Sequence, residues 1–414
     1  RAAHESRRVA TASVHASALA PLRSARFLED WEETPDRLAP FVGEDTIGRK
    51  AEIWLPSTWS VFVANGSLKL LHYVGDEAVF TARLPDESQS DVVLLKKVED
   101  GERAVREAKI SQRLTAFASL GYSAGRGHIV SRFDVQTHPE GTFVLSEPIT
   151  YGLEGTPTLA QVLRKRHETF VQGLPLNPYS DAGRPMSLAQ ASRIFIDVLR
   201  GLTFLDDAGI CHIGLSPNSV LLQDGRAVID GLGDMCYAFD GRDPLLACRG
   251  RLDVTDWEAQ SGVSALWQAP ELDHGCARGP PDHSWTAGLL YASMRFGYNP
   301  AARAAAKHID GWVAMVMYDV TSEGRAALRD LVADSFDIRM DPGFRDASPG
   351  EQEMLRGMLE RDRAKRWTAE RALKEAIALA EERQLEVPLA RKAPRTPIAL
   401  QAGAGVADIS DAWQ

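Results

Sequence analysis

The chain has 414 residues, of which 44% are apolar, enough for a large core divided between two lobes. Its net charge of −10 argues against a nucleic-acid or anionic-membrane surface, since both need basic patches. No stretch approaches the roughly 20 apolar residues of a membrane span. We therefore expect neither a nucleic-acid partner nor a membrane span. The chain starts at Arg1 without a Met or a recognisable signal peptide, so we expect an excised or processed piece.

The first part of the sequence predicts an extension followed by a small sheet. Residues 1–67 are polar and Arg-rich at first, and we expect them to be partly disordered and then packed on the next part. Alternating apolar residues predict a strand pair in 68–82 and a further strand in 91–98. Apolar runs within 128–145 complete the sheet, after a short helix around 105–110.

Helices dominate the second part. A helix is predicted at 158–167, and a long core helix at 187–207 begins with a serine N-cap candidate. Between them, 172–185 is rich in Pro, Gly and Asn and is expected to be a loop insertion. The Pro-, Ala- and Gly-rich tail, residues 383–414, is expected to be disordered.

The central stretch runs from Cys211 to Gly233. It contains two short apolar strands joined by a turn at Gln223-Asp224-Gly225, the pattern of a hairpin. It resembles the catalytic loop and metal-binding loop of a protein kinase, whose signature is H-R-D-L-x-x-x-N followed by D-F-G. His212, Leu215 and Pro217 agree with the family.

Later motifs extend the resemblance to the protein kinase superfamily over roughly residues 68–382. Ala269-Pro270-Glu271 matches A-P-E, Asp282 to Leu289 resembles D-x-W-S-x-G, and Met358 to Leu373 resembles M-L-x-x-D-P-x-x-R-x-T-A-x-x-A-L. The resemblance implies an α+β, bilobal kinase-like fold with a β-rich N-lobe at 68–148 and a helical C-lobe at 149–382. It also implies structural roles for His212, for Asp282 tied to the catalytic loop, and for a buried ion pair between Glu271 and Arg366.

The catalytic groups of the family are missing at the matching positions. In a kinase the loop Asp accepts the substrate proton, and the Asn and the D-F-G Asp hold magnesium. These positions fall on Gly214, Ser219 and Gly231. Asp230 lies one residue early and stays open as a stand-in. The resemblance therefore predicts a degenerate catalytic site without metal.

The phosphate-covering loop is also degenerate. If Val79 to Ala82 are taken as the family's V-Y-x-A, the three glycine positions hold His72, Val74 and Glu77. Glycine is needed there because backbone amides must approach the phosphates closely. Asp76 and Glu77 would also repel phosphate. An ordinary acidic hairpin turn makes the same prediction, so we expect no nucleotide cofactor.

One ion pair of the family could survive. Lys96 stands at the phosphate-pairing lysine of V-A-I-K, and Glu107 resembles the helix glutamate that pairs with it. The pair would act as a clamp between elements. The alternative is that both residues are solvated surface charges.

The expected function is that of a pseudokinase, an inactive kinase-like protein that serves as a protein-binding scaffold or allosteric regulator. We expect partners to bind through the activation-segment region, 234–263, and the 172–185 insertion. The alternative is an atypical active kinase that uses Asp230 or Asp234 for metal and Lys96 or Lys97 for phosphate.

The cysteines bear on localisation. None of Cys211, Cys236, Cys248 and Cys276 has zinc-site spacing, and a disulfide such as Cys236 to Cys248 is conceivable, although sequence cannot pair them. The extension, the degenerate loop and the extra cysteines resemble secreted rhoptry-type pseudokinases of apicomplexan parasites, including bradyzoite pseudokinases. That implies a parasite effector secreted into the parasitophorous vacuole, cyst wall or host cell. The alternative is a cytoplasmic signalling scaffold.

Overall fold

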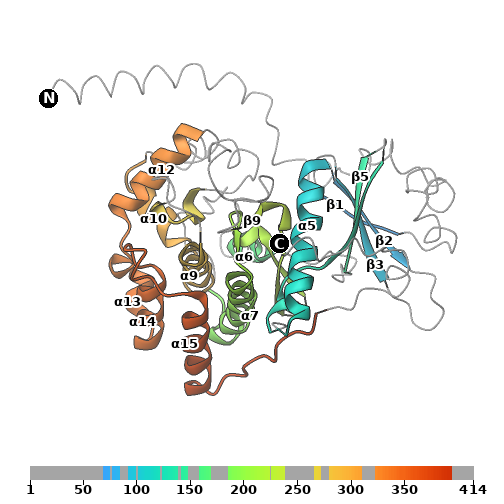
Figure 1. Cartoon of the computed structure of the whole chain (residues 1–414). Coiled ribbons are helices and arrows are strands. Elements are labelled where there is room, and N and C mark those ends of the chain that lie inside the picture. The colour runs from blue at the N-terminus through green and yellow to red at the C-terminus, as the bar shows by residue number, and fades with distance from the viewer. Residues whose placement is uncertain are drawn as a thin grey trace, which may run out of the picture. The chain divides into compact units, whose positions relative to one another are not determined.

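The computed structural model describes residues 69–74, 77–83, 92–98, 101–121, 124–138, 141–147, 158–168, 185–223, 225–237, 265–271, 279–309 and 322–393. Within these residues it has an α+β architecture, mostly helical with one larger sheet (Figure 1). The predicted α+β class is confirmed. No helix in the described part of the chain has the length and apolarity that a membrane crossing would need.

The larger sheet has five antiparallel strands in the order β1-β2-β3-β5-β4. Helix α5, Gly101–Ser119, lies beside it (Figure 1) and buries Ile110 and Leu114. The strands are β1 Lys69–Val74, β2 Glu77–Arg83, β3 Val92–Val98, β4 Arg132–His138 and β5 Gly141–Ser146.

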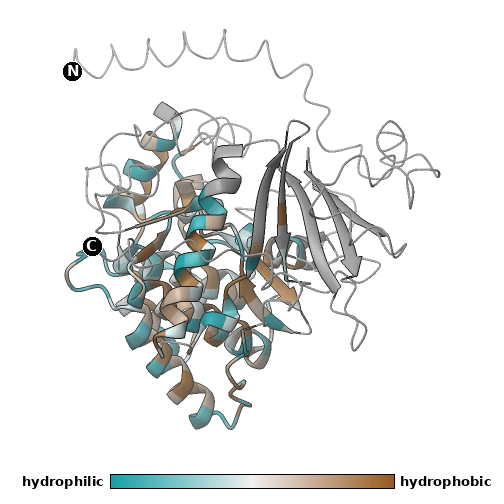
Figure 2. Cartoon of the chain, turned by 45° about the vertical axis from the view of Figure 1, so that its right-hand side comes forward, coloured by the Kyte–Doolittle hydropathy of each residue, from teal (hydrophilic) through white to brown (hydrophobic). Residues whose placement is uncertain are grey.

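Helices build the rest of the described chain. Hydrophilic and hydrophobic residues alternate along them (Figure 2), as expected for helices with one buried face. They are α6 Leu159–Glu168, α7 Leu188–Asp207, α9 Pro280–Phe296, α10 Pro300–Ala306, α12 Ser322–Ser335, α13 Pro342–Asp346, α14 Pro349–Met358 and α15 Ala369–Glu382. Short 3-10 turns are η4 Arg126–His128, η5 Pro217–Ser219, η6 Leu232–Asp234, η7 Ala265–Trp267 and η9 Ile338–Met340.

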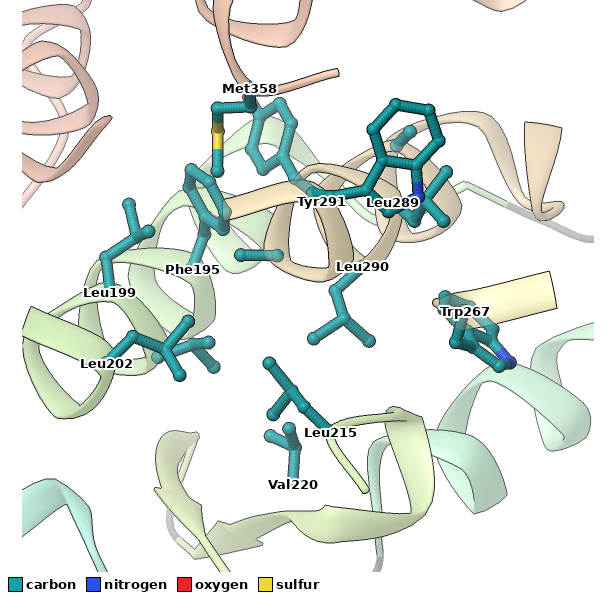
Figure 3. Close-up of a cluster of buried hydrophobic side chains, with 14 of the residues drawn as sticks. Phe195, Leu199, Leu202, Leu215, Val220, Trp267, Leu289, Leu290, Tyr291 and Met358 are labelled. Carbon is teal, nitrogen blue, oxygen red and sulfur yellow. The ribbon is translucent and has the colours of Figure 1, made fainter. Parts of the chain in front are cut away.

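Helix α7 is the centre of the core, as its apolar spacing predicted. Phe195, Leu199 and Leu202 of α7 gather with Leu290 and Tyr291 of α9 in one buried cluster (Figure 3). The rings of Phe195 and Tyr291 are 4.6 Å apart between centroids. The predicted serine cap is present, since the Ser187 side chain accepts a hydrogen bond from the Gln190 backbone.

Two short strand pairs carry the central stretch. Strand β6, Ile210–His212, pairs with β9, Met235–Tyr237, and strand β7, Val220–Gln223, pairs with β8, Arg226–Ile229. The predicted hairpin is therefore confirmed as β7–β8. Gly225 has φ +73°, a left-handed conformation that suits glycine in the connecting turn.

The tail prediction was wrong for its first residues. Beyond α15, residues 383–393 pack back on the protein, with Leu385 and Val387 against the core and Pro388 buried. Composition suggested disorder, but a few apolar residues with a matching surface are enough to hold an extended segment. The extension 1–67, most of the 172–185 insertion, most of the activation-segment region, and residues 394–414 lie outside the described residues.

Candidate functional site

The strand pairs β6–β9 and β7–β8 bring two short segments together. We call residues 212–219 the central loop and residues 230–234 the glycine turn. The Ile213 backbone N–H of the central loop donates to the carbonyl oxygen of Asp234, at 2.9 Å. Leu215 and Val220 anchor the loop in the main core (Figure 3). The two segments that resemble the kinase catalytic and metal-binding loops are therefore neighbours.

His212 ties the two segments to each other. Its Nε2 lies 2.8 Å from the carbonyl oxygen of Asp230, which can only accept, so Nε2 carries the proton. The ring is buried, and burial lowers the pKa of His212 to about 4. The ring is therefore neutral at physiological pH. The structural role expected for His212 agrees with these contacts.

His283 of α9, and not Asp282, binds the backbone of the central loop. The His212 backbone N–H donates to His283 Nε2 at 2.7 Å. On the other side of the ring, His283 Nδ1 lies 2.6 Å from the carboxylate of Asp206, at the end of α7. Asp206 therefore accepts the Nδ1 proton and leaves Nε2 unprotonated, as an acceptor for the loop.

Asp282 has another role, which corrects the role expected from the resemblance. Its Oδ2 accepts the Gly279 backbone N–H at 2.9 Å and caps the start of α9, and its Oδ1 lies 3.3 Å from Arg363 Nε. Neighbouring residues point about 100° apart around a helix, so only His283 of the two faces the loop. Counting back from Trp285 in D-x-W-S-x-G also places His283 at the Asp position, a signal present in the sequence.

Gly214, the degenerate base position, is covered by Asp234. A Cβ on Gly214 would lie only 2.7 Å from both Cβ and Oδ2 of Asp234. Real Cβ contacts are never so short, so the Asp234 side chain lies directly against the bare Cα of Gly214. Asp234 is buried in this position. A carboxylate therefore lies beside the place where the family carries its base, but on the opposite segment.

Gly231, the degenerate metal position, lies beside the same carboxylate. Its φ of +85° is a conformation that side chains rarely adopt. An added Cβ would be 3.2 Å from Cε1 of His212 and 3.6 Å from Oδ2 of Asp234. One acidic side chain, Asp234, thus lies next to both glycines, which stand where the kinase signature has aspartate.

Asp230, the open stand-in for a metal ligand, is engaged by an arginine. Arg132 Nη2 lies 2.5 Å from Asp230 Oδ1, and Arg132 Nε lies 3.0 Å from Glu107 Oε2. Arg132 begins β4, Glu107 lies on α5 and Asp230 follows β8. The three residues form an ionic triad across three elements, with the arginine side chain only 6% exposed.

The triad changes what Asp230 can bind. The guanidinium supplies a positive charge in the position where a divalent cation would otherwise be favoured. A cation close to Asp230 would be repelled by Arg132 or would have to displace it from two carboxylates. Sequence reasoning missed Arg132, because nothing in its local sequence indicates that it meets residues 25 and 98 positions away.

The positions that resemble the phosphate-binding residues of a kinase are only partly described. Lys96 lies on β3, opposite Val79 and Val144, and Glu77 begins β2 opposite Val74. The side chains of Lys96 and Glu77 lie outside the described part of the molecule. The Lys96–Glu107 pair therefore stays a prediction, while Glu107 is shown to bind Arg132.

Ser219, at the degenerate asparagine position, is used inside its own turn. Its hydroxyl donates to the Ser216 carbonyl oxygen at 2.9 Å, and it accepts the Ser216 backbone N–H at 3.0 Å. Together with Ser216 it forms a capping box for η5. The Ser219 carbonyl oxygen accepts the Asp230 backbone N–H at 2.8 Å. The residue stabilises the loop.

The expected ion pair between Glu271 and Arg366 is present. Arg366 Nη1 and Nη2 donate to the two carboxylate oxygens of Glu271, the second at 3.0 Å. The Arg366 side chain is fully buried, and its guanidinium lies over the Trp285 ring, 4.9 Å from the centroid. The pair links the segment after η7 to the segment that precedes α15.

Two cysteines are described. Cys211 is a buried thiol that is not disulfide-bonded, whereas Cys236, opposite it on β9, takes part in a disulfide. The partner of Cys236 lies outside the described residues, as does Cys248, the partner conceivable from the sequence. Among the residues that the structure describes, no group of three or more His, Cys, Asp or Glu side chains is placed to hold a metal ion.

No protein-family model matches the chain, and no curated protein sequence matches it. The functional assignment therefore depends on the residues and on their geometry.

Proposed function

We propose that this protein is a pseudokinase: a kinase-like protein, bilobal in plan, that binds a protein partner as a scaffold or allosteric regulator and does not transfer phosphate. The observation that carries the proposal is the position of the Asp234 carboxylate against the bare Cα of Gly214, where a kinase needs its catalytic aspartate.

The order of elements supports the kinase-like plan. A five-stranded antiparallel sheet with one helix beside it precedes a helical part. The central loop and the glycine turn lie side by side after α7, and the Glu271–Arg366 pair joins two later motifs of the family. These are the features that the resemblance implied for the scaffold.

The chemistry of the site argues against phosphoryl transfer. Phosphoryl transfer depends on positioning a nucleophile and on metal ions that neutralise the phosphates. Here glycine takes both aspartate positions, Ser219 is used within its turn, and Asp230 is bound by Arg132. Loss of a base alone would reduce the rate by about 10²–10⁴, but the metal ligands are lost as well.

The partner and the compartment are part of the proposal. We infer that partners bind through the activation-segment region and the 172–185 insertion. The disulfide at Cys236 favours a secreted protein over a cytoplasmic scaffold, because the cytosol keeps thiols reduced. This supports the secretion that the rhoptry-type resemblance implies, over the cytoplasmic alternative.

Nucleotide titration tests the proposal. We expect ATP with magnesium or manganese to leave thermal unfolding unchanged, because glycine stands at both aspartate positions of the kinase signature, Arg132 binds Asp230, and none of the three glycine positions of the phosphate-covering loop holds glycine. A ligand at 100 times its dissociation constant would stabilise the fold by about 2.7 kcal/mol, a shift that is easily measured. An active kinase measured in parallel provides the control.

A clear rise in melting temperature would contradict the proposal. If Asp230→Asn then removed that rise, the atypical active kinase that uses Asp230 for metal would take its place. If Asp230→Asn left the rise intact, the protein would bind nucleotide without that carboxylate.

A further inference from the structure

Residues 385–393, which follow α15, pack back on the protein. Gln384 has φ +55° and turns the backbone, and the Leu385 backbone N–H caps α15 by donating to Ala380 at 2.8 Å. We call residues 385–391 the C-terminal strap. In Figure 1 the strap, in red, runs from the end of α15 back toward α5 and the five-stranded sheet.

The first half of the strap is fixed to the helical part. Glu386 forms an ion pair with Arg193 of α7, and Arg226 of β8 donates to the Leu389 carbonyl oxygen at 2.5 Å. Pro388, between them, is buried. Because two elements hold the strap by side-chain contacts, its path over this surface is defined.

The strap ends at Arg391, which makes one contact at the end of β5 and two contacts with η4. Its guanidinium donates to the Glu147 carboxylate at 2.8 Å and to the Gly127 carbonyl oxygen at 2.6 Å, and its backbone N–H donates to His128 Nε2 at 3.1 Å. Glu147 directly follows β5 and is buried. Its second carboxylate oxygen accepts the Ser131 backbone N–H at 2.7 Å.

Gly127 has no side chain, and this leaves room for the backbone of the strap. A Cβ on Gly127 would lie 1.9 Å from the carbonyl oxygen of Arg391, so the strap backbone packs directly on the glycine. Any side chain at position 127 would push the strap away. The contact is therefore a close steric fit as well as an ion pair.

We propose that the C-terminal strap is an intramolecular clamp that holds the five-stranded sheet in one position relative to the helical part. One continuous segment is fixed to α15, α7 and β8, and it then binds Glu147 at the end of β5. Loss of the Arg391–Glu147 contact would leave the strap without a side-chain bond to the end of β5, so that its far end contacts only η4, through the Arg391 backbone N–H on His128. The clamp goes beyond the proposed function, because it requires no partner and no nucleotide.

Substitution of Arg391 tests the clamp, with a matched control at the next position. Arg391→Gln removes the charge that binds Glu147, and Lys392→Gln removes an equal charge from an exposed neighbour. We expect hydrogen exchange in 126–132 and in the strap to rise at least about tenfold in Arg391→Gln and to be unchanged in Lys392→Gln.

A distance measurement tests the position of α5, which is tied to strand β4 of the sheet by hydrogen bonds between the Ser111 hydroxyl and the Arg132 backbone. Leu120, at the end of α5, and Met340 of η9 are both more than half exposed, so cysteine substituted at each accepts a spin label. The chain without the added cysteines gives the labelling background. We expect a narrow distribution of the distance between the two labels in the chain that carries only the two added cysteines, and also when Lys392→Gln is added. We expect a broadened distribution when Arg391→Gln is added.

Two further variants keep the inference falsifiable. Gly127→Ala releases the strap without changing any charge and should reproduce the broadening. Glu147→Gln combined with Arg391→Gln should broaden the distance no more than Arg391→Gln alone, because both remove the same contact. Narrow distances in both Arg391→Gln and Gly127→Ala would overturn the clamp, whatever nucleotide titration shows.

Discussion

At the scale of single residues, the candidate site is closely packed and its carboxylates have partners within the protein. Gly214 has no side chain, and the space next to its Cα is taken by Asp234 from the facing segment. Asp230 keeps a carboxylate, but Arg132 binds it. The acidic groups of the site are therefore held by contacts within the protein.

Substitution at Gly214 measures how tightly the site is packed. Gly214→Ala places a methyl 2.7 Å from the Asp234 side chain, and overpacking of this kind costs about 1–3 kcal/mol. We expect the free energy of unfolding in urea to fall by that amount. Asn218→Ala, an exposed residue of the same loop, serves as the control and should be near neutral.

A double variant tests whether the Asp234 side chain causes the loss of stability in Gly214→Ala. Asp234→Gly removes the side chain that the new methyl would meet, so Gly214→Ala should cost at least about 1 kcal/mol less in that background. Equal costs in the two backgrounds would show that Asp234 is not the obstacle.

At the scale of elements, ionic contacts join segments that are distant in sequence. The triad of Glu107, Arg132 and Asp230 links α5, β4 and the glycine turn. The pair of Glu271 and Arg366 links the segment after η7 to the segment that precedes α15. Each places a buried arginine between elements. Loss of Glu271 would leave Arg366 without a carboxylate partner, whereas Arg132 has two.

The Glu271–Arg366 pair is expected to be needed for the helical part. Glu271→Ala leaves the buried Arg366 unpaired, which costs about 3–5 kcal/mol. The check is the melting temperature, which should fall clearly. Glu370→Ala breaks an exposed pair with Lys374 and should cost no more than about 1 kcal/mol. Similar melting temperatures for the two variants would count against a structural role of the buried pair.

At the scale of the whole molecule, two buried histidines connect stability to pH. His212 between the glycine turn and α9, and His128 between β8 and the strap, are both buried, and burial lowers the pKa of each. Both accept or donate hydrogen bonds as neutral rings. Asp197, Arg200 and Arg226 surround His128, and the carboxylate among them opposes part of the effect of burial.

The fold should therefore lose stability in acid. Between pH about 6.5 and about 4 the unfolded chain binds a proton at position 212 that the folded chain does not, so unfolding becomes easier as the pH falls. His212 alone accounts for up to about 3 kcal/mol of this loss. We expect the free energy of unfolding in urea to be lower at pH 4.5 than at pH 7.

A comparison of two histidine variants tests the assignment. His212→Gln should reduce the loss between the two pH values, whereas His308→Gln, at an exposed site, should leave it unchanged. An undiminished loss in His212→Gln would assign the acid sensitivity to other groups.

The sequence by itself determined the local elements and the absence of an acidic side chain at two positions of the central stretch. The spacing of apolar residues defined α7 and the β7–β8 hairpin, because helical and strand periods differ. Glycine at 214 and 231 excluded a carboxylate at each position, since no contact can supply a missing side chain. The tertiary structure alone showed which charges meet: Arg132 with Asp230, and Arg391 with Glu147. These partners are 98 and 244 residues apart. Only the packing of whole elements brings such distant side chains together, so no local pattern could encode them.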